Sequence, residues 1–111
     1  SRVSVKSVAR GNLPIAYQRV LEVCIRNMQE TRASGTIMEA VELFQQYITQ
    51  SNGLPKLRDQ QIRAMAAAFE YIACRKKDED ANKMQIAAAY GVTMLRLKNA
   101  LAKILRVLER S

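Results

Sequence analysis

The chain has 111 residues, 49% of them hydrophobic but only 5% aromatic, so it suits one domain with a core of mainly aliphatic side chains. Eighteen lysines and arginines oppose ten acidic residues, and the resulting formal net charge of +8 suits a polyanionic partner. The sequence has no histidine, no phosphate-binding glycine loop and no evident pair of catalytic carboxylates, so we predict neither an enzyme nor a metal or cofactor site.

The apolar runs are too short for a membrane protein. None approaches the roughly 18 residues that a membrane span needs, and the N-terminal residues lack the apolar stretch of a signal peptide. Cys24 and Cys74 lie far apart, each within an apolar helical pattern, and this favours buried free thiols over a disulfide or a metal site. We therefore expect a cytosolic or nuclear protein without a membrane partner.

Residues 1–11 mix small, polar and basic side chains without a helical stripe, so we predict an N-terminal arm or linker there and a single helical domain over residues 12–111. From Leu13 the apolar residues follow helical spacing as far as Met28. We predict a first helix over Leu13–Gln29, with Asn12 as its N-cap and Pro14 tolerated in the first turn.

A second helix is predicted after a turn at residues 31–35. Thr36 and Glu39 have the spacing of a capping box, and they precede an apolar stripe. The segment SNGLP at residues 51–55 then interrupts the helical pattern, because glycine and proline favour turns.

The third predicted helix contains QIRAMAAAFEYIACR and is apolar on several sides. A helix of this kind belongs in the middle of a bundle, and its alanines allow neighbouring helices to approach closely. The following charged segment, residues 75–80, is expected to be a solvated helix end and loop rather than a functional site.

Two further helices are predicted near the C-terminus. A short fourth helix should span Lys83–Tyr90 with Asn82 or a neighbouring aspartate as its cap, and Gly91 should end it in the left-handed conformation. Thr93 should cap the fifth helix, whose apolar stripe continues almost to the end of the chain. This spacing predicts a helix-turn-helix.

The second helix of such a unit places its N-terminal residues against base edges in the major groove of DNA. Arginine and lysine donate hydrogen bonds to guanine, asparagine pairs with adenine, and threonine can hold a phosphate. The outward positions of the fifth helix carry these residue types, and the predicted DNA-binding residues are therefore Thr93, Arg96, Lys98, Asn99 and Lys103. From Thr93 to the end of the chain, five basic residues accompany one acidic residue, so we predict strongly salt-dependent binding.

The segment GLPKLRDQQIRAMAAAFEYIACRKKDEDANKMQIAAAYGVTMLRLKNALAKIL resembles the latter part of a cyclin-like repeat of transcription factor IIB, most closely its second repeat. The most specific pieces are AAAFEYIACR, which looks like the family's central helix, and IAAAYGVTMLRLKN, which looks like its helix-turn-helix. The resemblance covers about half the chain and implies an all-α, five-helix cyclin-like box arranged around the alanine-rich third helix.

The resemblance also implies a function in transcription initiation. Members of this family bind double-stranded promoter DNA beside the TATA-binding protein and help to recruit RNA polymerase, so the implied location is the nucleus, or the cytoplasm if the source is archaeal. In the family's second repeat the recognition helix contacts the B recognition element in the major groove, and the corresponding residues here are Leu95, Arg96, Leu97 and Lys98. Lys98 stands where the family has an arginine, and a lysine cannot provide the planar fork that recognises guanine through two hydrogen bonds.

Two alternatives remain open from the sequence. A cyclin-like protein-interaction module that does not bind DNA has the same fold, and the replaced arginine favours it. A bacterial-type regulator with an unrelated helical dimerisation region would form a stable two-fold dimer, whereas the cyclin-like box is expected to be a monomer.

Overall fold

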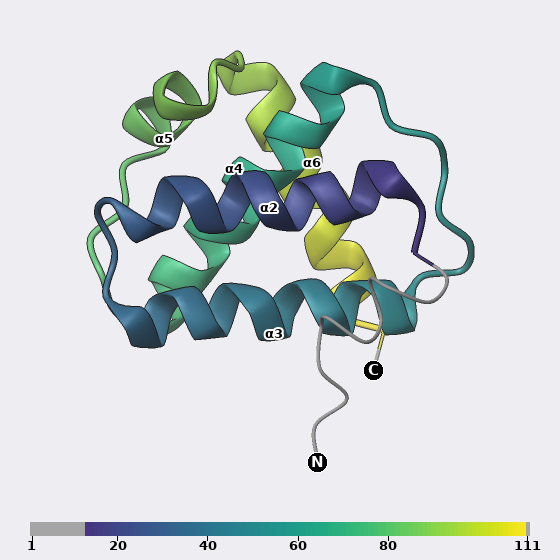
Figure 1. Ribbon diagram of the computed structural model, residues 1–111, viewed down its shortest axis with the longest axis horizontal. Coiled ribbons are helices and arrows are strands. Elements are labelled where there is room, and N and C mark those ends of the chain that lie inside the picture. The colour runs from purple at the N-terminus through teal and green to yellow at the C-terminus, as the bar shows by residue number, and fades with distance from the viewer. Residues whose placement is uncertain (1–12, 111) are drawn as a thin grey trace.

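The computed structural model describes residues 13–110, and the predicted arm at residues 1–11 and the predicted cap Asn12 lie outside this range. All the regular structure in the described range is helical, as predicted (Figure 1). The five helices are α2 (Ile15–Gln29), α3 (Ser34–Gln50), α4 (Asp59–Lys76), α5 (Lys83–Tyr90) and α6 (Met94–Leu108).

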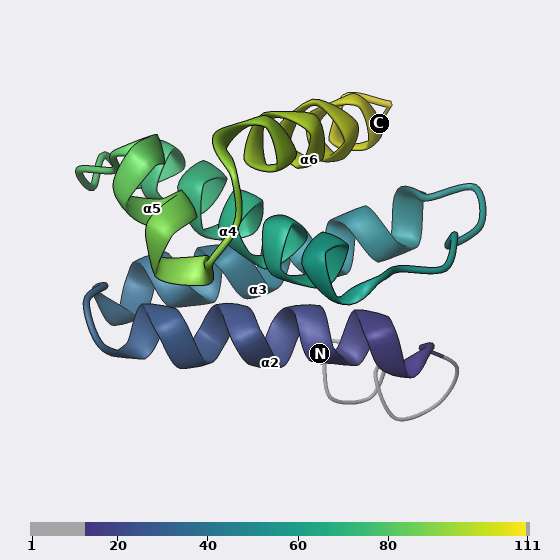
Figure 2. The same cartoon turned by 90° about the horizontal axis from the view of Figure 1, so that it is seen from above.

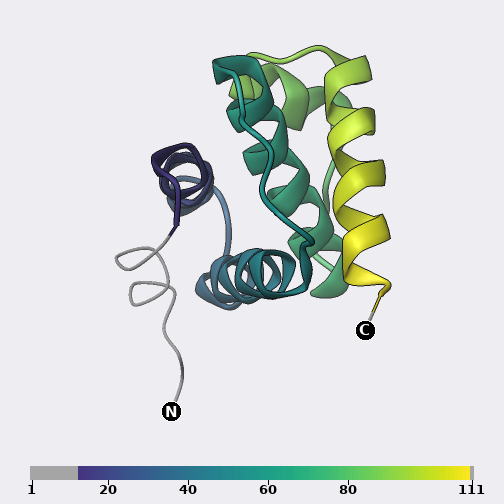
Figure 3. The ribbon, with the colours of Figure 1, turned by 90° about the vertical axis from the view of Figure 1, so that its right-hand side faces the viewer.

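Helix α4 is the central element, as the sequence predicts. It contacts all four other helices, and it lies between α2 and α6 (Figures 2 and 3). Helices α4 and α6 cross each other (Figure 1), and both begin at the end of the molecule that is at the top of Figure 3. This arrangement exposes one whole side of α6.

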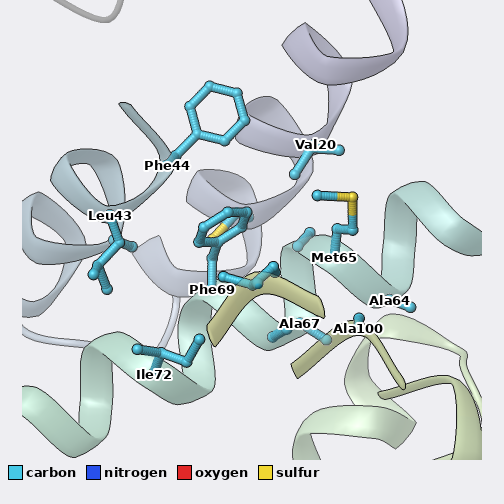
Figure 4. Close-up of a cluster of buried hydrophobic side chains, with 14 of the residues drawn as sticks. Val20, Leu43, Phe44, Ala64, Met65, Ala67, Phe69, Ile72 and Ala100 are labelled. Carbon is cyan, nitrogen blue, oxygen red and sulfur yellow. The ribbon is translucent and has the colours of Figure 1, made fainter. Parts of the chain in front are cut away.

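The core is built around the alanines and Phe69 of α4. Ala66, Ala67 and Ala68 are completely buried, which allows helices to pack close to α4 on several sides. Phe69 makes edge-to-face contacts with Phe44 and with Tyr47 of α3, each with ring centroids 5.7 Å apart. Figure 4 shows Phe69 together with the side chains that α2, α3 and α6 contribute to this cluster.

The first helix begins two residues later than predicted. Pro14 occupies the N-cap position of α2, and Leu13 is buried ahead of the helix instead of forming its first turn. The physical reason is the proline ring, which disfavours helical geometry for the residue before it.

The predicted capping box of the second helix is wrong. Helix α3 begins at Ser34 after Ala33, and no side chain caps it. Thr36 is instead buried, and its hydroxyl donates a 2.6 Å hydrogen bond to Oε1 of Glu79, while Glu39 forms an ion pair with Lys76. Both residues therefore have partners from a later part of the chain, and these replace the local cap.

A buried carboxylate on α4 binds both the α2–α3 connection and the end of α5. Glu70 of α4 accepts a 2.7 Å hydrogen bond from Nε of Arg32 and a 2.6 Å hydrogen bond from the hydroxyl of Tyr90. Arg32 also donates through Nη1 to the carbonyl of Asp80 at 2.7 Å. Because a buried charge is costly unless it is paired, these contacts fix the α2–α3 connection and the end of α5 to α4.

Both cysteines are buried free thiols, as predicted. Burial raises the pKa of Cys74 to about 11 and raises that of Cys24 further still. Both thiols are therefore protonated, and their role is to pack in the core rather than to react.

Candidate nucleic-acid interface

The turn between α5 and α6 has the backbone geometry that the sequence predicts. Gly91 has φ 68° and ψ 36°, in the left-handed region that favours glycine. Its N–H donates to the carbonyl of Ala88, and the N–H of Val92 donates to that of Ala87, which satisfies the last carbonyls of α5. The chain therefore forms two separate helices joined by a tight turn.

Side-chain caps fix the first turn of each of these helices. Asn82 accepts a 2.9 Å hydrogen bond from the backbone N–H of Gln85, and Thr93 accepts one of 3.2 Å from the N–H of Arg96. Both predicted caps are confirmed. The Thr93 cap sets the direction in which α6 leaves the turn, and so positions the side chains of its first turn.

Arg63 ties this turn to α4. Its Nη1 donates to the carbonyls of Tyr90 and Gly91 at 3.2 and 2.8 Å, and its Nε forms an ion pair with Asp59 at 3.1 Å. A cation at the carbonyl end of a helix is also favoured by the helix dipole. The start of α6 is therefore held on the N-terminal end of α4.

The α5–α6 unit has an apolar interior. The buried side chains are Ile86, Ala87, Tyr90, Leu97 and Ala100, and Val92 is half-buried. Burial raises the pKa of Tyr90 far above its ordinary value, with the Glu70 hydrogen bond adding to the effect. Tyr90 therefore stays a neutral hydrogen-bond donor, and its bond to Glu70 joins α5 to the centre of the bundle.

The structure places the predicted DNA-binding residues on the outer surface of α6. Leu95, Arg96, Lys98 and Asn99 are exposed, Thr93 is exposed at the cap, and Lys103 is half-buried. The sequence of α6, Met94–Leu108, contains four basic residues and no acidic one. The charged side chains of this helix are therefore all positive.

These residues do not all face the same neighbours. Arg96, Asn99 and Lys103 line a shallow hollow between α6 and the N-terminal part of α4, next to Leu57. Lys98 lines a different groove, on the other flank of α6. The exposed Leu95, with 68% of its surface accessible, stands at the start of the helix. The two flanks thus carry separate groups of basic side chains.

The second groove contains basic residues that the sequence analysis assigned to a solvated helix end. Arg75 and Lys76 of α4 and Lys83 of α5 line it together with Lys98. These residues lie up to 23 positions apart, so only the packing of the three helices brings them together. The sequence shows these side chains only as basic residues at the end of one helix and the start of the next. Such residues alone do not predict a shared site.

The described residues were also compared with the requirements of a metal site and of a membrane span. Within residues 13–110 no group of three or more cysteine, aspartate or glutamate side chains is arranged to hold a metal ion. None of the five described helices has both the length and the apolar content needed to cross a bilayer. Comparisons with protein-family models, with curated proteins and with solved structures found no match.

Proposed function

We propose that this chain is a non-catalytic DNA-binding domain of a transcription-initiation factor, in which α6 enters the major groove of duplex DNA. The observation that carries the proposal is the tight, capped turn between two helices, followed by a helix whose outward face is basic. Helix-turn-helix proteins bind DNA with such a helix, using residues of its N-terminal part.

Each predicted residue has a chemical role in this proposal. Arg96 can donate two hydrogen bonds to guanine, and Asn99, one turn away on the same flank, can pair with adenine. Lys98 and Lys103 neutralise phosphates. Leu95 makes an apolar contact with a thymine methyl group. Thr93 already caps the helix, and its exposed position allows its hydroxyl to donate to a phosphate as well.

The first test is a fluorescence-anisotropy titration of labelled duplex DNA at several salt concentrations. The wild-type affinity should fall linearly on a logarithmic plot against salt, because each phosphate contact releases counterions. The double variant R96E/K98E should bind roughly thirtyfold more weakly or worse, because each lost contact costs about 1–3 kcal/mol.

A matched control keeps the change in net charge the same. The variant R19E/R26E reverses two exposed arginines on α2, on the opposite side of α4, and should bind DNA within about threefold of the wild type. Circular dichroism should show both variants folded. Equal weakening by both variants, or no binding by the wild type at low salt, would contradict the proposal.

The resemblance to transcription factor IIB supports the wider part of the proposal, namely the TATA-binding protein and RNA polymerase as partners. A gel-shift assay can separate this part from DNA binding alone. The chain should retard a promoter duplex further when the TATA-binding protein is present, and more than it retards a duplex without a TATA element. An unchanged pattern would leave a DNA-binding domain outside this family's assembly.

A further inference from the structure

A second basic surface adjoins the proposed reading face of α6 and shares Lys98 with it. It is a groove of about 500 Å³ between the C-terminal half of α4 and the middle of α6, with the first residue of α5 at its edge. Three helices contribute its basic side chains, which are Arg75, Lys76, Lys83 and Lys98. None of the described residues that line it is acidic.

The groove also has an apolar surface. Tyr71 and Ile72 of α4 line it opposite Leu101 and Leu105 of α6. Leu105 leaves 40% of its surface exposed, and Tyr71 is only partly buried. Apolar side chains that share an exposed hollow are typical of a surface that binds another molecule.

The positive charge of the groove is only partly compensated. Lys76 forms an ion pair with Glu39 of α3 at 3.3 Å. Within residues 13–110 the structure contains no ion pair of Arg75, Lys83 or Lys98. The Nζ atom of Lys83 lies 5.3 Å from the ring centroid of Tyr71, a cation–π distance that holds the ammonium group beside the apolar floor.

We propose that this groove binds an acidic amphipathic helix of a protein partner. Such a helix presents leucine-like side chains on one face and carboxylates beside them, which matches an apolar floor with basic side chains around it. The phosphates of a DNA duplex would pair with the lysines and the arginine, but its backbone offers no apolar face to contact Leu105 and Tyr71. The combination of charge and apolar surface therefore favours a peptide over a second DNA contact.

The groove shares one residue with the proposed DNA site. Lys98 lines the groove and also belongs to the predicted reading residues of α6. A carboxylate that pairs with Lys98 would compete with a phosphate for the same ammonium group. The acidic helix should therefore weaken DNA binding, although the groove proposal itself requires no DNA.

The test uses three fluorescein-labelled synthetic peptides of about 15 residues, near the length at which isolated helices begin to form. The first carries leucines at helical spacing and glutamates beside them. The second replaces every glutamate by glutamine, and the third has the composition of the first with the leucines scattered around the helix. Anisotropy titrations with the full chain should show at least roughly tenfold tighter binding of the first peptide, because both its charge and its apolar face are matched.

Two variants of the chain separate the groove from the DNA site. R75E/K83E and L105Q should each weaken binding of the acidic peptide roughly tenfold, since charged and apolar contacts are lost separately. The control R19E/R26E should leave peptide binding unchanged. Thermal unfolding followed by circular dichroism establishes that each variant is folded.

Two outcomes would overturn the proposal. One is equal affinity for the three peptides, which would show no recognition of an acidic amphipathic helix. The other is a wild-type chain that binds none of the peptides while R75E/K83E loses affinity for duplex DNA, which would make the groove part of the DNA contact. The peptide titrations themselves do not require that α6 binds DNA.

Discussion

Two pairs of helices, α2–α3 and α5–α6, pack against α4 and bury similar apolar faces, but their outer surfaces differ in charge. Helices α2 and α3 together contain two arginines and three glutamates, whereas α5 and α6 contain five basic residues and no acidic one. Packing alone explains both pairs equally well. The one-sided charge of α5–α6 is not explained by packing, and the proposed polyanionic partner would account for it.

The two pairs also differ in how their connections are fixed. Three local features determine the ends of α5 and α6, namely the caps Asn82 and Thr93 and the left-handed Gly91. The connection between α2 and α3 depends on distant partners instead, because Arg32 reaches Glu70, 38 positions away in the sequence. The α5–α6 connection thus has local determinants in addition to its contact with Arg63, whereas the α2–α3 connection has no side-chain cap and depends on Arg32.

The largest expected effect comes from removing the carboxylate on which both pairs depend. Glu70→Ala removes the nearer of the two carboxylates paired with the largely buried Arg32, leaving only Glu79 at 3.6 Å, and it removes the acceptor of the Tyr90 hydroxyl. Breaking a buried pair in this way should lower the free energy of unfolding by about 3–5 kcal/mol. Urea unfolding followed by circular dichroism measures this loss.

The exposed Glu42 of α3 provides the control, and Glu42→Ala should change the stability by less than about 0.5 kcal/mol. A loss below about 1 kcal/mol for Glu70→Ala would mean that the buried contacts of Glu70 do not hold the two pairs together.

Two glycines sharpen the contrast between local and distant determinants. Gly91→Ala places a Cβ in the left-handed region and only 2.7 Å from Nη1 of Arg63, which then has to leave the carbonyls that it binds. The stability should fall by about 1–2 kcal/mol. Gly35, in the first turn of α3, has open space around the added Cβ, so Gly35→Ala should raise the stability by up to about 1 kcal/mol.

Thermal or urea unfolding measures the change in stability of each variant relative to the wild type. Changes of the same sign would show that the Gly91 turn has no special conformational requirement.

Much of the α5–α6 unit could be predicted from the sequence because its determinants are short-range. Asn82, Gly91 and Thr93 each act within a few residues of their own position, and the apolar spacing identifies the buried faces. The outer residues Arg96 and Lys98 could be assigned to the surface by the same periodicity. What they bind is a prediction that rests on their chemistry.

The remaining features depend on contacts that periodicity does not contain. Thr36 and Glu39 have the spacing of a capping box, but Glu79 and Lys76 provide stronger partners across the bundle. Glu70 is the only charged residue in the apolar stretch of residues 64–74, which signals a buried partner without identifying it. The basic groove requires α4, α5 and α6 to be assembled before its residues meet.

The smallest expected effect is the pH dependence of Tyr90. Burial raises its pKa, so above about pH 10 the unfolded chain ionises this tyrosine while the native chain keeps it protonated. Its stabilisation is therefore fully present below pH 10 and decreases as the pH rises above that value. Tyr90→Phe should cost about 1 kcal/mol at pH 7, and the difference from the wild type should narrow above pH 10.

Urea unfolding at pH 7, 9 and 10.5 tests this trend, and Tyr71→Phe serves as the control because Tyr71 is only partly buried. A difference between Tyr90→Phe and the wild type that stays constant or widens with pH would contradict the assignment.

The most direct test of the central claim is a two-dimensional ¹H–¹⁵N NMR titration of the chain with duplex DNA at low salt. The account predicts that the largest shift changes fall on the backbone amides of Thr93, Arg96, Lys98 and Asn99, and that α2 and α3 change little. Changes concentrated on the outer face of α2 and α3, or no changes at all, would contradict the claim that the basic face of α6 binds DNA.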